Sequence, residues 1–585
     1  MIKKYIKKPF LSFSTFVLLF ICLFANISKS QDLQDNIILQ PQGLEHTGIY
    51  SLKNIAPELT GEGVKYAVIC RSFTYIDGEP QNDYRPFTLH NCFKSKTFGF
   101  YDHSEISSGV SPHSTAICSI LFGEDPDAFY PDTGAFIYEG TTPNAQADIY
   151  EFWYFISNYV FDHSPPDADI ITIAFGNQFE HWWTRGIESL VEHYGLNIIA
   201  SIGNGTDSHD PVLYPAAGSN VIGVGVVNSV NSDNQAINLS NFSIVYPENS
   251  SIGPTANGQC KPDIVAPGNC LAADIFEPNQ YEPTGNWSSF ATPLVAGAAG
   301  LLVQKAKLEP DLSMAVSPYG GNCVIKAILM NSATKLPYWH KGFLSTDDDH
   351  TAPLDYIQGA GMLNALSAYE HLISGQQKPG NVSAIGWDLN QLNNNVTYEK
   401  IYKFSLSESD NKIITATLTW NKNFSNVYPF ESLPEKDNNL RLELWAVDLM
   451  NPTNNYLLDY SDSSIDNVEH IHTAADPNFT NYEVIISISN NDDQKAINTI
   501  QRYGLAWNAS IKGEEDSLFW YDLNSDGVVD SSDYAIVMVN LLNSPESFEN
   551  YVFGDVNPDG VINTSDIEMF LENNNRQADW YIKNN

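Results

Sequence analysis

The longest helix that the sequence predicts begins at the stretch Trp287-Ser288-Ser289-Phe290-Ala291-Thr292-Pro293. From Ala291 to Lys307 the chain is apolar and rich in small residues, which is typical of a helix buried at the centre of a domain. A helix start presents backbone N–H groups and the positive end of the helix dipole, and both favour a negatively charged oxygen. A serine at this place therefore suits acyl transfer, which needs a nucleophile and donors for an oxyanion.

Apolar runs and helical patterns alternate along the chain before this helix. We expect strands at residues 64–69, 168–173 and 197–202, and a helix at 181–193 between the last two strands. Strand–helix–strand alternation predicts an α/β domain with a mostly parallel sheet, which we place at residues 43–376.

A different pattern begins near Pro379. Apolar and polar residues alternate with a period of two at 414–420 and 482–488, and clusters of Asn, Asp and Pro separate such runs. This pattern predicts an antiparallel β-sandwich at residues 379–512. Residues 513–516 are the expected linker to a last, small module.

Two segments of that module repeat one spacing of oxygen-bearing side chains, with glycine at the sixth loop position (Gly527 and Gly560). Calcium takes about six to eight oxygen ligands, and a tight loop of this kind supplies them from alternate residues. The candidate ligands, with one backbone carbonyl in each loop, are Asp522, Asn524, Asp526, Val528, Asp530 and Asp533, then Asp555, Asn557, Asp559, Val561, Asn563 and Asp566. Two full matches favour two calcium ions over a chance Asn- and Asp-rich turn. Helices are expected to follow the loops at 534–542 and 567–573.

The net charge and the N-terminal sequence limit which partners and which cellular location we expect for this chain. Seventy acidic residues against 30 basic ones give a formal net charge of −40, which argues against nucleic acid and anionic membranes as partners. The excess is explained equally well by a solvated acidic surface.

Four lysines precede an apolar run from Pro9 to Ala25, and small residues stand at Ser28 and Ser30, so residues 1–30 are predicted to be a secretory signal peptide. An uncleaved membrane anchor is the alternative, but the run is short for a span. We expect a secreted, extracellular protein with no membrane contact after signal cleavage.

Six cysteines remain after residue 30: Cys70, Cys92, Cys118, Cys260, Cys270 and Cys323. An even number of cysteines in an exported chain raises the possibility of disulfides, and the spacing alone does not choose among pairings.

The first domain resembles the subtilisin-like serine peptidases, or subtilases. The stretch 287–293 resembles their nucleophile motif, Gly-Thr-Ser-Met-Ala-Thr-Pro, which implies that Ser289 is the nucleophile. His113-Ser114-Thr115 resembles the motif of the base histidine, so His113 takes the role of general base. The run 199–204 resembles the strand that ends in the oxyanion asparagine, so Asn204 takes that role. The following sandwich resembles one that is appended to some subtilases.

The same comparison exposes three departures. Where the family has the aspartate that orients the histidine, this chain has Cys70. Ser114 replaces the glycine after the base, and Trp287 replaces the glycine two residues before the nucleophile, where an indole would crowd the cleft. Loss of the aspartate alone costs roughly 3 × 10⁴ in turnover in subtilisin itself, so slow hydrolysis remains possible. Asp77 is a candidate substitute, and a Cys70 thiolate is another, although a buried thiol usually stays neutral.

The last module, at residues 517–580, resembles a type I dockerin, because a duplicated loop and helix with aspartate at the twelfth loop position ends an exported multidomain chain. Dockerins bind cohesin modules of a scaffolding protein, and loop positions ten and eleven often take part. Here those positions are Ser531, Ser532, Thr564 and Ser565. A generic polar loop end explains these four residues equally well.

Two functions follow from these resemblances. One is a secreted serine endopeptidase, weak because of Cys70, that acts on protein or peptide and is attached to a cohesin-bearing scaffold. The alternative is an inactive pseudoprotease that serves as a protein- or peptide-binding module in an extracellular complex.

Overall fold

The computed structural model covers most of the two large domains and parts of the last module. It describes residues 38–40, 47–71, 75–76, 79–80, 83–103, 109–130, 134–205, 212–227, 250–268, 270–285, 287–336, 339–342, 350–393, 398–407, 409, 412–489, 500–511, 529–542, 563–572 and 574–575. The predicted signal peptide lies outside these residues. No helix among them is long and apolar enough to cross a membrane.

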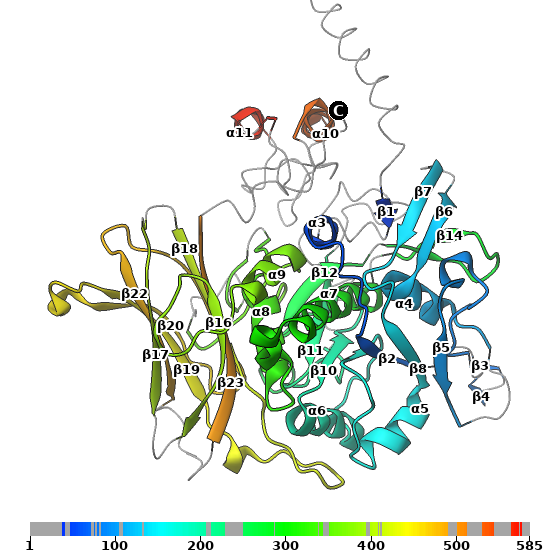
Figure 1. Ribbon diagram of the computed structural model, residues 1–585, viewed down its shortest axis with the longest axis horizontal. Coiled ribbons are helices and arrows are strands. Elements are labelled where there is room, and N and C mark those ends of the chain that lie inside the picture. Colours follow the sequence, from blue (N-terminus) through cyan, green and yellow to red (C-terminus); the bar gives the residue numbers. More distant parts are fainter. Residues whose placement is uncertain are drawn as a thin grey trace, which may run out of the picture.

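A seven-stranded sheet forms the centre of the first domain (Figure 1). All neighbouring strands in it run parallel, as predicted. The strands, in spatial order, are β12 (Ile264–Pro267), β11 (Ile222–Val227), β10 (Asn197–Ser201), β9 (Ile170–Ile173), β2 (Lys65–Cys70), β8 (Gln146–Glu151) and β5 (Phe98–Tyr101). The order reverses between β2 and β9, because the chain continues from β2 to one side and from β9 to the other. In open parallel sheets the functional cleft lies at such a reversal, beyond the carboxyl ends of the strands.

Both faces of this sheet are buried, and alternate residues of β2 show which helices cover each face. Tyr66, Val68 and Cys70 belong to the core that includes residues of α4 (Pro112–Phe122) and α7 (Ser288–Leu308). Ala67 and Ile69 belong to the opposite core, formed with α5 (Phe152–Phe155) and α6 (Trp182–Tyr194). Because strand side chains alternate between faces, the last residue of β2 points toward α4 and α7.

Helix α7 is the predicted central helix, and most of its residues are buried. It begins at Ser288, with Trp287 as its N-cap residue, and it packs against β9, β10, β11 and β12. Two shorter helices, α8 (Gly321–Asn331) and α9 (Ala365–Ile373), follow it, and α3 (Ile49–Ile55) precedes the sheet. The described part of the domain also holds three small sheets, built from β1 (Ile38–Gln40), β7 (Gly134–Glu139) and β6 (Glu124–Tyr130); from β13 (Leu271–Ala273) and β14 (Tyr281–Pro283); and from β3 (Tyr75–Ile76) and β4 (Glu79–Pro80).

Two further sheets follow in the chain and share one apolar core. The first, in spatial order, holds β15 (Gly380–Asn381), β17 (Glu399–Ser405), β22 (Asn481–Ile488), β19 (Leu440–Val447) and β20 (Tyr456–Ser461). The second holds β16 (Gly386–Asn393), β23 (Ile500–Ile511), β18 (Lys412–Thr419) and β21 (Val468–Ala474). Except for the short pair of β15 with β17, neighbouring strands run antiparallel.

The second of these sheets packs directly on α8 of the first domain (Figure 1). A side chain at Gly504 of β23 would lie 2.4 Å from the carbonyl carbon of Cys323, so only glycine fits there. Hydrogen bonds cross the same interface, since the Thr419 hydroxyl donates to the Cys323 carbonyl at 2.7 Å and the Thr417 hydroxyl donates to Asn331 at 2.9 Å. Buried polar pairs and close backbone contact fasten the two domains together.

The described part of the last module consists of α10 (Ser531–Leu542) and α11 (Thr564–Glu572). Both helices begin three residues before the predicted starts at 534 and 567, so the ends of both calcium loops are helical. In each case the carboxylate of the third helical residue accepts a hydrogen bond from the N–H of the residue before the helix: Asp533 from Asp530 at 2.8 Å, and Asp566 from Asn563 at 2.7 Å. Half of a capping box thus starts each helix earlier than hydrophobic periodicity indicates.

Candidate active site

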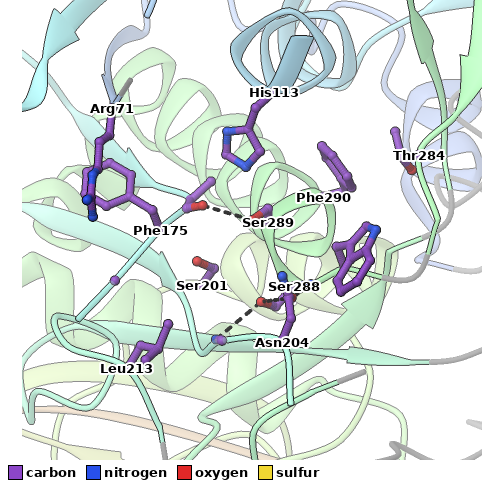
Figure 2. A pocket seen from close by; sticks show the side chains of 14 residues that line it. Arg71, His113, Phe175, Ser201, Asn204, Leu213, Thr284, Ser288, Ser289 and Phe290 are labelled. Carbon is purple, nitrogen blue, oxygen red and sulfur yellow. Dashed lines mark hydrogen bonds between the residues drawn. The ribbon is translucent and has the colours of Figure 1, made fainter. Parts of the chain in front are cut away.

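A pocket of about 500 Å³ opens beyond the carboxyl ends of β2, β9 and β10, where the strand order reverses (Figure 2). Segments distant in the sequence meet there, including the first turn of α7 and the start of α4. The described residues that line it are Arg71, His113, Ala174, Phe175, Gly176, Ser201, Gly203, Asn204, Leu213, Thr284, Trp287, Ser288, Ser289 and Phe290. The three predicted catalytic residues, Ser289, His113 and Asn204, therefore line one pocket.

The first turn of α7 holds Asn204 in place. Both the backbone N–H and the hydroxyl of Ser288 donate to Oδ1 of Asn204, each at 2.8 Å. The N–H of Gly203 in turn donates to the Ser288 hydroxyl at 3.3 Å. Because the amide oxygen is occupied by these donors, the Asn204 NH₂ group is the part that can donate to a ligand. Ser288 is not among the predicted site residues. Its position at the start of the predicted helix, next to Ser289, was the only sequence feature that pointed to this role.

Ser289 is nearly buried, with 8 % of its surface exposed. Its hydroxyl donates to the backbone carbonyl of Ala174 at 2.9 Å (Figure 2). A serine hydroxyl has one proton, so in this arrangement that proton is directed at the carbonyl and not at the His113 ring. A turn of the Ser289 side chain is needed before His113 can take the proton.

His113 lies in the first turn of α4, a helix capped by Ser111, whose hydroxyl accepts from the N–H of Ser114. The imidazole is half-buried and stands with its ring centre 5.8 Å from that of Phe290. Burial lowers the pKa of His113 to about 4, because the charged form loses its water. The ring is therefore neutral at neutral pH and can accept a proton, as a general base must.

Cys70 ends β2, and its side chain is buried on the face that α4 covers. Burial raises the pKa of this thiol to about 12, an effect that the Ser114 side chain reduces. The thiol is therefore uncharged at neutral pH, and it cannot supply the negative charge that an aspartate would supply to an imidazolium. The burial of Cys70 therefore argues against its thiolate as a substitute for the missing aspartate. The other candidate, Asp77, lies outside the described residues.

Trp287 lines the pocket beside the nucleophile, and 42 % of its surface is exposed. Ser114, the third departure, is buried inside α4. The helix is continuous through this position, from Pro112 to Phe122. The side chains of Arg71 and Phe175 also line the pocket, and neither residue is among the predicted site residues (Figure 2).

The six cysteines named above are all buried, and all six are free thiols. The possibility of a disulfide framework is therefore wrong for this structure. Five of the six belong to the same apolar core: Cys70 at the end of β2, Cys92 in the short helix Asn91–Phe93, Cys118 in α4, and Cys260 and Cys270.

Only four of the twelve predicted calcium ligands lie within the described residues: Asp530, Asp533, Asn563 and Asp566. The carboxylates of Asp533 and Asp566 are fully buried, at equivalent places in the two repeats. Each accepts the backbone hydrogen bond described above, and carboxylate oxygens at these loop positions are of the kind that calcium binds. These residues fit a calcium site. The other eight predicted ligands lie outside the described residues: Asp522, Asn524, Asp526, Val528, Asp555, Asn557, Asp559 and Val561. Of the four expected cohesin contacts, Ser531 and Thr564 are exposed in the first turns of α10 and α11.

The two repeats also contact one another. The N–H of Asn575 donates to the carbonyl of Val529 at 2.8 Å, and the rings of Tyr534 and Phe570 lie 5.8 Å apart. The described residues, including the described ends of the two loops, contain no cluster of three or more His, Cys, Asp or Glu side chains that could hold a metal ion.

Fold and pocket together define a class of protein: a parallel α/β domain whose cleft holds a serine at a helix start, a neutral histidine and an anchored asparagine. The chain belongs to the subtilase family, whose model matches residues 51–361, and it carries a dockerin type I domain at residues 520–573. Type I dockerins bind calcium and cohesin modules, and a peptidase domain implies a protein substrate.

Several characterised proteases are similar to parts of the chain. Serine protease AprX of Bacillus subtilis is 27% identical over 343 residues, which cover 54% of this chain and 68% of AprX. The C5a peptidase of Streptococcus pyogenes is 36% identical over 121 residues, and pyrolysin of Pyrococcus furiosus is 26% identical over 224 residues. These matches cover 20% and 35% of this chain, but only 9% and 15% of the two relatives.

Proposed function

We propose that this chain is a secreted serine endopeptidase of low turnover, attached through its dockerin to a cohesin-bearing scaffold. The observation that carries the proposal is the pocket itself, where Ser289, His113 and Asn204 meet while the residue that should orient the histidine is the neutral thiol of Cys70. We assign the subtilase domain to residues 43–376, the sandwich to 379–512 and the dockerin to 517–580.

In this proposal the Ser289 hydroxyl turns from the Ala174 carbonyl toward His113, loses its proton to the imidazole and attacks the scissile carbonyl. The Asn204 amide and the backbone N–H of Ser289 stabilise the oxyanion, since the N–H of Ser288 already donates to Asn204. The imidazolium that forms has no charge at position 70 to stabilise it, which is the expected cause of slow turnover.

The decisive experiment measures hydrolysis of a denatured protein by the full chain and by a Ser289→Ala variant. We expect slow cleavage by the wild type, at a rate roughly 10⁴-fold below that of an intact subtilase. The variant should cleave far more slowly still. Cleavage that the variant retains in full would show that a contaminant, or another site, performs the reaction.

A second candidate function is a pseudoprotease that binds peptide without cleaving it. The bond from the Ser289 hydroxyl to the Ala174 carbonyl favours it, because this bond directs the proton away from the base. Equal peptide binding by wild type and Ser289→Ala, with no cleavage by either, would select this alternative.

For the last module we propose two calcium ions, held by the twelve loop residues named above, and cohesin contacts from Ser531, Ser532, Thr564 and Ser565. The buried carboxylates of Asp533 and Asp566 support this proposal. Bound calcium compensates their charge and stabilises the folded module, by about 2.7 kcal/mol when its concentration is 100 times its dissociation constant.

Calorimetry of the full chain with calcium and with a chelator tests the metal. A melting transition of the last module that does not move on chelation would remove calcium from the proposal. Cohesin binding, measured by titration in both conditions, should require the metal, and the Asp533→Ala and Asp566→Ala variants should lower it.

Secretion rests on the lysine-rich and apolar N-terminus, and subtilases that carry dockerins are typically extracellular. Sequencing of secreted protein should find an N-terminus close to Gln31. Mature protein that retains Met1 would contradict this proposal.

A further inference from the structure

Arg71 stands at the mouth of the candidate active site. It follows Cys70 directly at the carboxyl end of β2, it is exposed, and its side chain lines the pocket. Figure 2 shows it on the same side of the pocket as Phe175, in the segment that continues from β9. Arg71 lies just beyond the last residue of β2, so it belongs to the chain segment that leaves the sheet at the cleft.

The charge of the pocket is set by few groups. Among the described lining residues, Arg71 and His113 are the ionisable ones, and neither a carboxylate nor a lysine is present in that set. Burial lowers the pKa of His113 to about 4, so its ring is neutral at neutral pH. Arg71 therefore brings a positive charge into a cleft whose other described lining residues are neutral, in a chain whose net charge is −40.

A guanidinium in this place is suited to one kind of ligand group. It offers five N–H donors in a planar fork that matches the two oxygens of a carboxylate. It can keep a contact within the chain and still donate to a ligand. Distant acidic groups of the surface do not cancel this local interaction, because salt screens charges beyond about 8 Å at physiological ionic strength.

We propose that Arg71 is a specificity residue of the cleft and that it binds an aspartate or glutamate side chain of the bound peptide, next to the peptide bond held at Ser289. The inference rests on the proposed function only in that the pocket holds a peptide. It adds a substrate class, acidic peptides, and it applies equally to cleavage and to binding without cleavage.

The test measures peptide retention on the full-length Ser289→Ala protein, so that turnover does not interfere. The probes are short peptides, acetylated and amidated at their ends, that are identical except for Glu, Gln or Lys at one scanned position. Retained peptides are quantified by mass spectrometry. We expect the Glu peptide to exceed its Gln partner by about ten-fold at the best position, as a charge-assisted hydrogen bond implies, and the Lys peptide to be retained least.

Three second substitutions sharpen the result. Arg71→Met should bring the ratio of Glu to Gln peptide close to one, and Arg71→Glu should reverse the preference in favour of Lys. Arg502→Met is the matched control, because it removes the same charge from β23, where Arg502 lies over the Tyr319 ring outside the described pocket lining. It should leave the ratio unchanged. Equal melting temperatures of the three variants and their parent exclude misfolding as the cause.

Equal retention of Glu and Gln peptides, on a protein that does retain peptides, overturns the role of Arg71 and leaves the proposed function standing. A preference that survives Arg71→Met overturns it too. Failure to retain any peptide contradicts the proposed function itself and removes the basis of the inference.

Discussion

The two sides of the candidate active site differ in how many of the expected catalytic groups they contain. On one side Asn204 is held by two hydrogen bonds of 2.8 Å from Ser288 at the start of α7. On the other side the position expected to orient His113 is occupied by Cys70, a buried thiol whose pKa burial raises to about 12. The side that would stabilise the oxyanion is complete in its described contacts, whereas the side that would support the base has no charge at position 70.

This difference separates two tasks that the oxyanion donors and the triad of an intact subtilase perform together. Positioned donors for an oxyanion remain useful to any peptide that lies in the cleft with its carbonyl near Ser289, whether or not the bond is cleaved. A carboxylate behind the histidine is useful only for proton transfer, since it orients the ring and stabilises the imidazolium. In the proposed roles, the cleft thus holds the donors that would contact a bound peptide and has no carboxylate at position 70 to serve the reaction.

The largest effect is expected from restoring that group. Cys70→Asp should raise the rate of peptide hydrolysis, by up to ~10⁴-fold if the new carboxylate reaches His113. The full gain requires an open cleft, so the double variant Cys70→Asp with Trp287→Gly should exceed either single variant. The measurement is kcat/KM on a fluorogenic peptide.

Cys70→Ser is the matched control, because it changes the thiol to a small polar group without adding charge. It should give no gain. An ordinary protease rate in the wild type, lost on Ser289→Ala, would break the comparison and would make Asp77 the first candidate for the orienting residue. Melting curves must accompany the rates, since a carboxylate buried without a partner destabilises the fold.

A smaller effect is expected on the complete side. Asn204→Ala should lower the residual kcat by about 10²- to 10³-fold, the loss measured when the equivalent donor is removed from subtilisin itself. Ser288→Ala should cost less, because the backbone N–H of residue 288 still donates to Asn204. Equal kcat values for wild type and Asn204→Ala would show that this side does not stabilise an oxyanion.

The smallest effect is a shift in the pH profile. Burial lowers the pKa of His113 to about 4, so the base is neutral above that pH, and kcat/KM should fall only as the pH drops through about 4. A carboxylate favours the imidazolium, so Cys70→Asp should raise the pKa of His113 and move this acid limb upward. An acid limb at the same pH in both proteins would mean that residue 70 does not act on His113.

The sequence determined most of the architecture. The alternation of apolar runs with helical patterns predicted the parallel α/β sheet, and the observed α7 begins within the stretch 287–293 that was predicted to start it. The motifs around Ser289, His113 and Asn204 predicted three residues that line one pocket. These features can be predicted because they depend on the spacing of residues along the chain. Helix and strand geometry determines from that spacing which residues share a face.

Other features were decided only by the tertiary structure. The six cysteines are buried as free thiols, a state that their spacing did not determine, and the packing of α7 on the sheet brings the Ser289 hydroxyl to the Ala174 carbonyl. The helices after the calcium loops begin earlier than predicted. The carboxylates of Asp533 and Asp566 accept hydrogen bonds from the backbone N–H of the residue before each helix, and hydrophobic periodicity does not reveal such bonds. The position of Arg71 was also decided by the tertiary structure. Its charge can be read from the sequence, but its place in the cleft depends on where β2 ends and on residues brought there from far along the chain.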